Sequence, residues 1–68
     1  MAVARVTEII SSSTKSFDDA IKAGVERACT TLEKVQGAWV KEQKLVIDKG
    51  KIKEYRVNLM ITFILKDS

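Results

Sequence analysis

The chain has 68 residues, with one cysteine, no histidine, and a net charge of +3 from 12 basic and 9 acidic residues. This composition excludes an intrachain disulfide and a zinc site built from the usual Cys and His ligands. Four aromatic residues (two Phe, one Trp and one Tyr) and a mild, scattered basic excess do not favour nucleic acid as a partner. We expect a single domain over residues 1–68, with a core so small that self-association is its remaining means of stabilisation.

Targeting and enzyme signatures are missing from the sequence. No segment has the roughly 18 apolar residues of a membrane span, and the first residues do not form a secretory signal. With a lone cysteine, this pattern predicts a cytoplasmic protein without a membrane partner. There is no histidine for acid–base chemistry, no Gly-rich phosphate loop and no metal triad, and we interpret Cys29, beside apolar Ala28, as a structural, partly buried thiol. The sequence therefore predicts no catalytic residue and no enzyme.

The first half of the chain predicts a strand and a helix. Residues Ala2–Ile10 are rich in β-branched side chains, which is typical of a strand. The hydroxyl side chains of Ser11–Thr14 favour a turn, and Ser16 is the best candidate for the N-cap of a helix. We predict that this helix spans Phe17–Val35 and ends at Gly37 as its left-handed C-terminal residue.

Helical spacing defines one apolar face on the predicted helix. The steps of three and four residues that form it connect Phe17, Ala20, Ile21, Gly24, Val25, Ala28, Leu32 and Val35. Gly24 lies inside this face although glycine costs about 1 kcal/mol of helix propensity relative to alanine. Its position predicts that the helix approaches the sheet or another helix closely there.

The second half of the chain predicts a long hairpin. Two alternating segments, from Ala38 and from about Ile52 to Leu65, flank Asp48–Lys51, with Lys49–Gly50 as a two-residue loop. Together with the first strand they give an α+β fold of order β-α-β-β, with the helix across one face of a three-stranded antiparallel sheet. One helix cannot cover so long a strand, so we expect other copies of the protein to bury the remaining face.

The two-residue loop also predicts which hairpin side chains share the face away from the helix. The expected pairs are Trp39 with Met60, Lys41 with Asn58, and Gln43 with Arg56. In one interpretation, Trp39 and Met60 pack at a subunit interface. In the other, Trp39 stacks on a flat ligand while Arg56 or Gln43 anchors its polar edge, and Lys41, Lys44 and Arg56 favour a phosphate.

The element order and several local sequences resemble the dodecin family over nearly the whole chain. The segments that carry the resemblance are SSSTKSFDDAIKAGVERACTTLEKV and the later VKE…KEYRVNLMITFIL pattern. The resemblance implies a bacterial protein whose twelve copies form a hollow homododecamer with tetrahedral symmetry. It also implies binding and storage or sequestration of a flavin (FMN, FAD or riboflavin), without catalysis.

The resemblance also carries the site residues. In flavin-binding members, a tryptophan at the start of the second strand stacks on the ring and a glutamine of the third strand pairs with its edge. Here Gly37 takes the tryptophan position, Trp39 follows two residues later on the same face, and Arg56 takes the glutamine position. The expected ligand-binding residues are Gly37, Trp39, Gln43, Lys44 and Arg56.

Arginine at the glutamine position resembles a subgroup of the family that is associated with calcium. The alternative is therefore a structural or calcium-binding dodecin that holds no flavin. The chain has no run like an EF-hand loop, and calcium requires six or more oxygen ligands. A calcium site would have to be assembled between subunits, and its ligands are not assigned.

Overall fold

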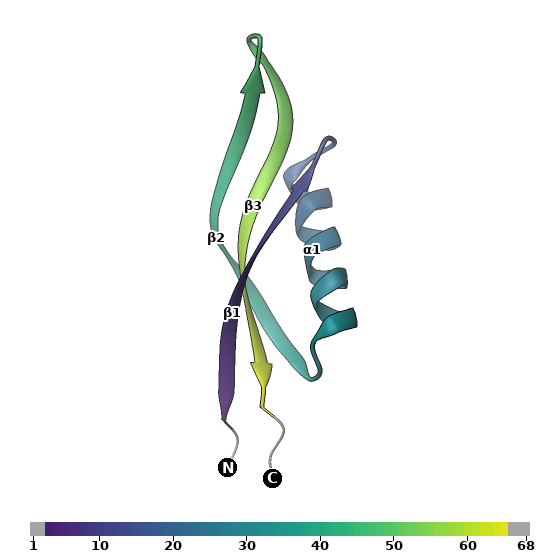
Figure 1. Ribbon diagram of the computed structural model, residues 1–68, viewed down its shortest axis with the longest axis vertical. Helices are drawn as coiled ribbons and strands as arrows, with labels where there is room; N and C mark the ends of the chain where they lie inside the picture. The colour runs from purple at the N-terminus through teal and green to yellow at the C-terminus, as the bar shows by residue number, and fades with distance from the viewer. Residues whose placement is uncertain (1–2, 66–68) are drawn as a thin grey trace.

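A three-stranded antiparallel sheet carries a single helix in the computed structural model, which describes residues 3–65 (Figure 1). The elements in chain order are β1 (Ala4–Ser13), α1 (Phe17–Thr31), β2 (Val35–Asp48) and β3 (Lys51–Ile64). The strand order is β1-β3-β2, so the third strand lies in the centre. The predicted α+β class and β-α-β-β order are confirmed, while the predicted strand start at Ala2 lies outside the described residues.

The serine-rich segment belongs to the first strand, so the prediction of a turn at Ser11–Thr14 is wrong for its first three residues. β1 continues to Ser13 because residues Ser11 to Ser13 pair with Val57 to Tyr55 of β3. The hydroxyl groups nevertheless accept backbone hydrogen bonds at the start of the helix, as expected. Ser13 Oγ accepts from the Lys15 N–H at 2.9 Å, and Ser16 Oγ accepts from the Asp19 N–H at 3.0 Å. The predicted N-cap at Ser16 is confirmed.

The helix is shorter than predicted, since it ends at Thr31 and not at Val35. Leu32 already has extended backbone angles, and its N–H closes the helix on the Ala28 carbonyl at 2.8 Å. Lys34, with φ of 56°, is the left-handed residue, and Gly37 lies within β2. Leu32 and Val35 still pack against the core. Their spacing therefore indicated correctly that both residues pack against the core. It did not show that they do so at the start of a strand and not in a further turn of the helix.

Small side chains let the helix lie close to the central strand. Ala20, Gly24 and Ala28 are the buried residues of α1, and they face the buried Val57, Leu59 and Ile61 of β3. A Cβ atom added to Gly24 would lie 2.7 Å from Leu59 Cδ1 and 3.0 Å from Ser11 Cβ. The predicted close approach at Gly24 is confirmed, and its partner is the sheet. The predicted partial burial of Cys29 is wrong, because its side chain is exposed on the helix.

Three irregularities shift the hairpin register: one leaves Gln36 as an extra residue near the start of β2, and the two nearer the turn compensate each other. The turn pairs Ile47 with Ile52, but Val46 pairs with Glu54, so Lys53 is an extra residue in β3. Lys41 is the compensating extra residue in β2, because Glu42 pairs with Asn58 and Val40 with Leu59.

These shifts leave one of the predicted cross-strand pairs unchanged and alter the other two. Trp39 lies opposite Met60 as predicted, since both compensating bulges lie between this pair and the turn. Between the bulges the predictions are wrong, because Lys44 and not Gln43 pairs with Arg56. Gln43 pairs with Val57, whose side chain lies on the helix side of the sheet.

The hairpin extends well beyond the helix (Figure 1). The chain measures 52 × 18 × 13 Å, and its radius of gyration is 14.0 Å, whereas a compact chain of this length has about 11 Å. Near the turn, Leu45, Ile47 and Ile52 are exposed. Within residues 3–65, no helix is long and apolar enough to cross a membrane.

Candidate functional site

The sheet face that α1 leaves uncovered gathers most of the predicted site residues, and we call it the open face. Its members, assigned from the strand register, include Glu8 of β1, Arg56, Asn58, Met60 and Thr62 of β3, and Gly37, Trp39, Lys41 and Lys44 of β2. Thus Gly37, Trp39, Lys44 and Arg56 share one face. Gln43 does not, because the bulge at Lys41 places it beside Val57.

Trp39 offers an accessible aromatic surface on the open face. Its side chain is 52% exposed although it lies within a strand, and its cross-strand partner is the partly buried Met60. Two residues along β2, a Cβ atom at Gly37 would meet nothing within 4 Å. The space over Gly37, two residues along the strand from Trp39, is therefore open. An exposed indole beside such a space can stack on a flat ligand.

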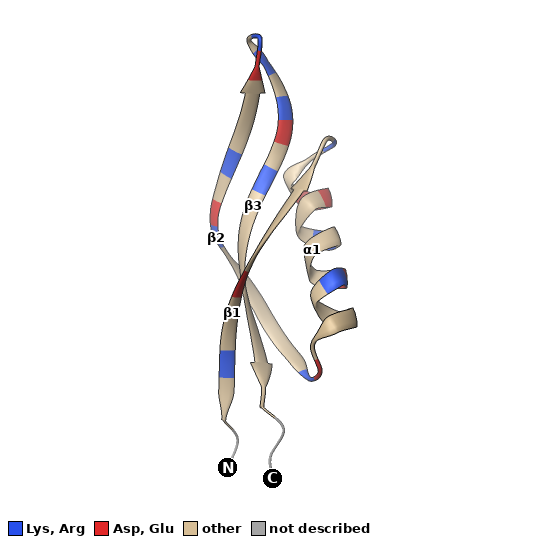
Figure 2. Cartoon of the chain, viewed as in Figure 1, with Lys and Arg blue, Asp and Glu red and all other residues tan. Residues whose placement is uncertain are grey.

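Cations and carboxylates alternate along the part of the open face nearer the turn (Figure 2). Arg56 Nη2 donates to Glu54 Oε1 at 3.0 Å, and Lys44 Nζ lies 3.7 Å from Glu42 Oε1. Arg56 and Lys44 are cross-strand partners, so two positive groups lie together and remain partly exposed. This pair can attract a phosphate group.

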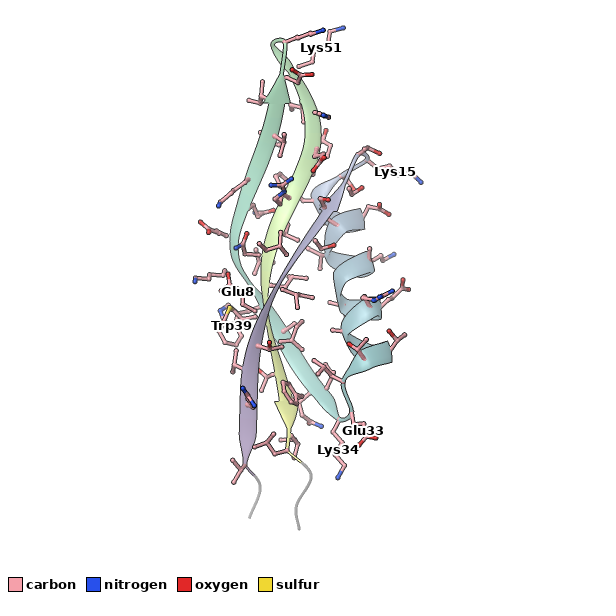
Figure 3. The ribbon with its side chains drawn as sticks, in the orientation of Figure 1. Glu8, Lys15, Glu33, Lys34, Trp39 and Lys51 are labelled. Carbon is pink, nitrogen blue, oxygen red and sulfur yellow. The ribbon has the colours of Figure 1, made fainter. Side chains whose placement is uncertain are left out.

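Glu8 is a residue of this face that the sequence analysis did not assign to the site. Its Oε2 accepts a hydrogen bond from Asn58 Nδ2 at 3.0 Å, and its Oε1 lies 3.7 Å from Lys41 Nζ. The Asn58 hydrogen bond, and then the charge of Lys41, lower the pKa of Glu8 below its ordinary value. Glu8 is therefore a carboxylate that is ionised at neutral pH, in the same cross-strand row as Trp39 with Met60 between them (Figure 3). The available signal in the sequence was a charged residue among the β-branched residues of the first strand, where Arg5 is the other charged residue.

A family model for Dodecin matches residues 3–66 of this chain, so the protein belongs to the dodecin family. It is 34% identical to calcium dodecin from Mycobacterium tuberculosis, over 97% of this chain and 93% of that protein. A crystal structure of a Thermus thermophilus dodecin variant covers 100% of both chains at 31% identity and a TM-score of 0.92.

The crystal structure of calcium dodecin from M. tuberculosis, described as a calcium-chelating antigen, also matches. It is 34% identical, covers 97% of this chain and 94% of its own, and gives a TM-score of 0.83. The backbone similarity to the Thermus protein is therefore higher although the sequence identity is slightly lower.

The residues present do not fit the flavin contacts that the resemblance implies. Gly37 supplies no ring to stack at the tryptophan position. Arg56 can only donate hydrogen bonds, and it already donates one to Glu54. Glutamine would both donate and accept at a ring edge. A flavin would have to use Trp39 instead, about 7 Å further along the strand.

A single chain does not fit calcium either. Among residues 3–65, no three Asp, Glu, Cys or His side chains are grouped so that they could hold a metal ion. The carboxylates of Glu8, Glu42 and Glu54 each contact a cation of their own face. Six or more oxygen ligands for calcium would have to come from several copies of the chain.

Proposed function

We propose that this protein assembles into a hollow homododecamer that binds and stores a small, planar, phosphate-bearing ligand without converting it. Family membership supports the assembly, as does the elongated chain, whose hairpin exposes Leu45, Ile47 and Ile52. Isolated apolar residues are common on surfaces, but three exposed apolar side chains close together on a hairpin end that projects beyond the helix favour a partner. Light scattering should give twelve times the 7.6 kDa chain mass. A mass of one or two chains would refute the assembly.

The exposed Trp39 beside the open space at Gly37 is the observation that carries the ligand site. A planar ring can stack on the indole while the Lys44 and Arg56 pair attracts a phosphate that the ring carries. Flavin nucleotides are the ligands that the family resemblance implies. Because glycine stands at the family's stacking position, flavin nucleotides would bind this chain through Trp39.

Tryptophan emission is a direct assay because Trp39 is the only tryptophan. We expect FMN to quench it at micromolar concentration and riboflavin, which lacks the phosphate, to bind more weakly. Substitution Lys44→Gln should reduce the difference between FMN and riboflavin, whereas Lys51→Gln in the remote hairpin turn should leave it unchanged. If no planar phosphate-bearing compound quenches Trp39 or binds by calorimetry, the proposed ligand site is wrong.

A double variant tests whether the family's flavin mode can be restored. Gly37→Trp supplies a ring at the family's stacking position, where an added Cβ atom meets nothing within 4 Å, and Arg56→Gln, reaching that ring from another copy in the assembly, supplies an edge that both donates and accepts. We expect this variant to bind riboflavin at least about tenfold more tightly than the parent chain, through one stacking contact and the edge hydrogen bonds. An unchanged affinity would show that Gly37 does not lie at the stacking position.

Calcium binding between subunits is the second candidate function, favoured by the similarity to calcium dodecin. The ligands would be carboxylates of several copies, so the site would exist only in the assembly. Calorimetric titration of the assembled protein with calcium chloride should then give saturable heat, and magnesium chloride serves as the matched control. Equal or absent heats for both ions would reject this candidate.

A further inference from the structure

Glu8, Met60 and Trp39 form one row across the three strands of the open face. Met60 of the central strand pairs with Glu8 of β1 on one side and with Trp39 of β2 on the other. Two strand spacings separate the backbones of Glu8 and Trp39 by about 10 Å, which long side chains from both sides can bridge over Met60. Figure 3 shows Glu8 and Trp39 together where β1 crosses in front of the hairpin.

The Glu8 carboxylate is fixed in place and still has free acceptor capacity. Asn58 and Lys41 each occupy one of its oxygens, and the side chain remains 36% exposed. Because a carboxylate has about four lone-pair positions, two remain for groups outside the protein. Asn58 is itself nearly buried, so its contact holds Glu8 in one position.

Arg56 is too far from Trp39 to share the same ring edge. It lies four residues along β3 from Met60, a separation of about 13 Å. Lys44, its cross-strand partner, is displaced in the same direction. A ring stacked on Trp39 can therefore present its edge to Glu8, and only an attached tail can reach Lys44 and Arg56.

We propose that Glu8 reads the edge of the ring bound at Trp39 and selects rings with two adjacent N–H donors. This inference rests on the proposed function, since it concerns the same ligand site. The chemistry is the 2-amino-4-oxopyrimidine edge of guanine and pterin, whose ring N–H and amino group match the two carboxylate oxygens. The flavin edge alternates carbonyl, N–H and carbonyl, so its carbonyl oxygens would face the charged carboxylate. Adenine presents one amino donor beside a ring acceptor.

Calorimetry with GMP, IMP, AMP, FMN and pterin tests this selection on the assembled protein. We expect GMP to bind at least about tenfold more tightly than AMP or FMN, because it makes one more charge-assisted hydrogen bond and avoids repulsion. IMP, which lacks the 2-amino group, should fall between them. Comparison of GMP with guanosine and pterin then shows whether a phosphate-bearing nucleotide or a free pterin ring is preferred.

Two variants distinguish the effect of the Glu8 carboxylate on ligand preference from the effect of the protein's net charge. Glu8→Gln should remove most of the preference for GMP over AMP, whereas Glu33→Gln, in the turn between α1 and β2, should keep it (Figure 3). If FMN binds the parent chain more tightly than GMP, the inference is wrong and the proposed ligand site stands. If no compound binds, the proposed site is wrong as well. If Glu8→Gln does not assemble, the relative affinities of the ligands for the parent chain still test the inference.

Discussion

Gly24→Ala should destabilise the protein although it improves the intrinsic helix propensity of α1. Alanine gains about 1 kcal/mol over glycine in a helix interior. The new methyl group would lie 2.7 Å from Leu59 Cδ1 and 3.0 Å from Ser11 Cβ. Leu59 is only 1% exposed, and overpacking of such a core typically costs about 1–3 kcal/mol. The net expectation is a loss of about 1 kcal/mol in the free energy of unfolding.

Urea unfolding followed by Trp39 emission measures this loss, at one fixed chain concentration because assembly contributes to stability. Ala23→Gly is the matched control. Ala23 is the exposed neighbour in the same helix, so its substitution reports the propensity difference without a core contact. If Gly24→Ala stabilises the protein by as much as Ala23→Gly destabilises it, the contact with Leu59 has no energetic cost and the reasoning is refuted.

Three further predictions concern the helix cap, the turn and the carboxylate. Ser16→Ala removes the acceptor of the Asp19 N–H and should lower the free energy of unfolding by about 1 kcal/mol in the same urea assay; an unchanged midpoint would contradict it. Lys49 and Gly50 have φ of 53° and 76°, so Lys49→Asn should stabilise this type I′ turn by about 0.5 kcal/mol, and a lower thermal midpoint would refute it. Because the folded-state pKa of Glu8 lies below its ordinary value, its contribution is present at neutral pH and is lost as the pH falls through that lowered value. Glu8→Gln should thus be less stable at pH 7 and equal to the parent near pH 2; a constant difference would contradict this.

The sequence sufficed where a local pattern and the tertiary structure agree. The hydroxyl at Ser16 followed by acidic residues predicted the cap, and the Lys49–Gly50 loop predicted the turn. Alternation in the last strand predicted that Val57, Leu59 and Ile61 meet the helix. Gly24, which is costly in a helix, predicted close packing because only a tertiary contact offsets that cost.

The predictions failed where the deciding contact is distant in sequence. Helical spacing continues through Leu32 and Val35, and only the packing of β2 against the core shows that they are no longer helical. The extra residues Lys41 and Lys53 are ordinary strand lysines, so nothing local marks a bulge. Because the predicted register did not include these two extra residues, it placed Gln43 on the open face, where the structure does not have it.

Glu8 was missed for the same reason. Its partners are Asn58, fifty residues away in the chain, and Lys41 of another strand. A charged residue in the first strand, whether Glu8 or Arg5, gave no indication of which side chains it would meet. The ion pair of Glu8 with Lys41, and the cross-strand row that Glu8 shares with Trp39, could therefore be identified only from the strand register.

The bulges make the hairpin tolerant of small changes in length. Gln36, Lys41 and Lys53 have no cross-strand partner, so the loss of any one of them would leave every other pair and every other side-chain orientation as it is. A one-residue loss anywhere else in these strands would turn all side chains up to the next irregularity onto the opposite face. When sequences of different hairpin length are aligned with this chain, a single gap therefore belongs at Gln36, Lys41 or Lys53 and not in the turn.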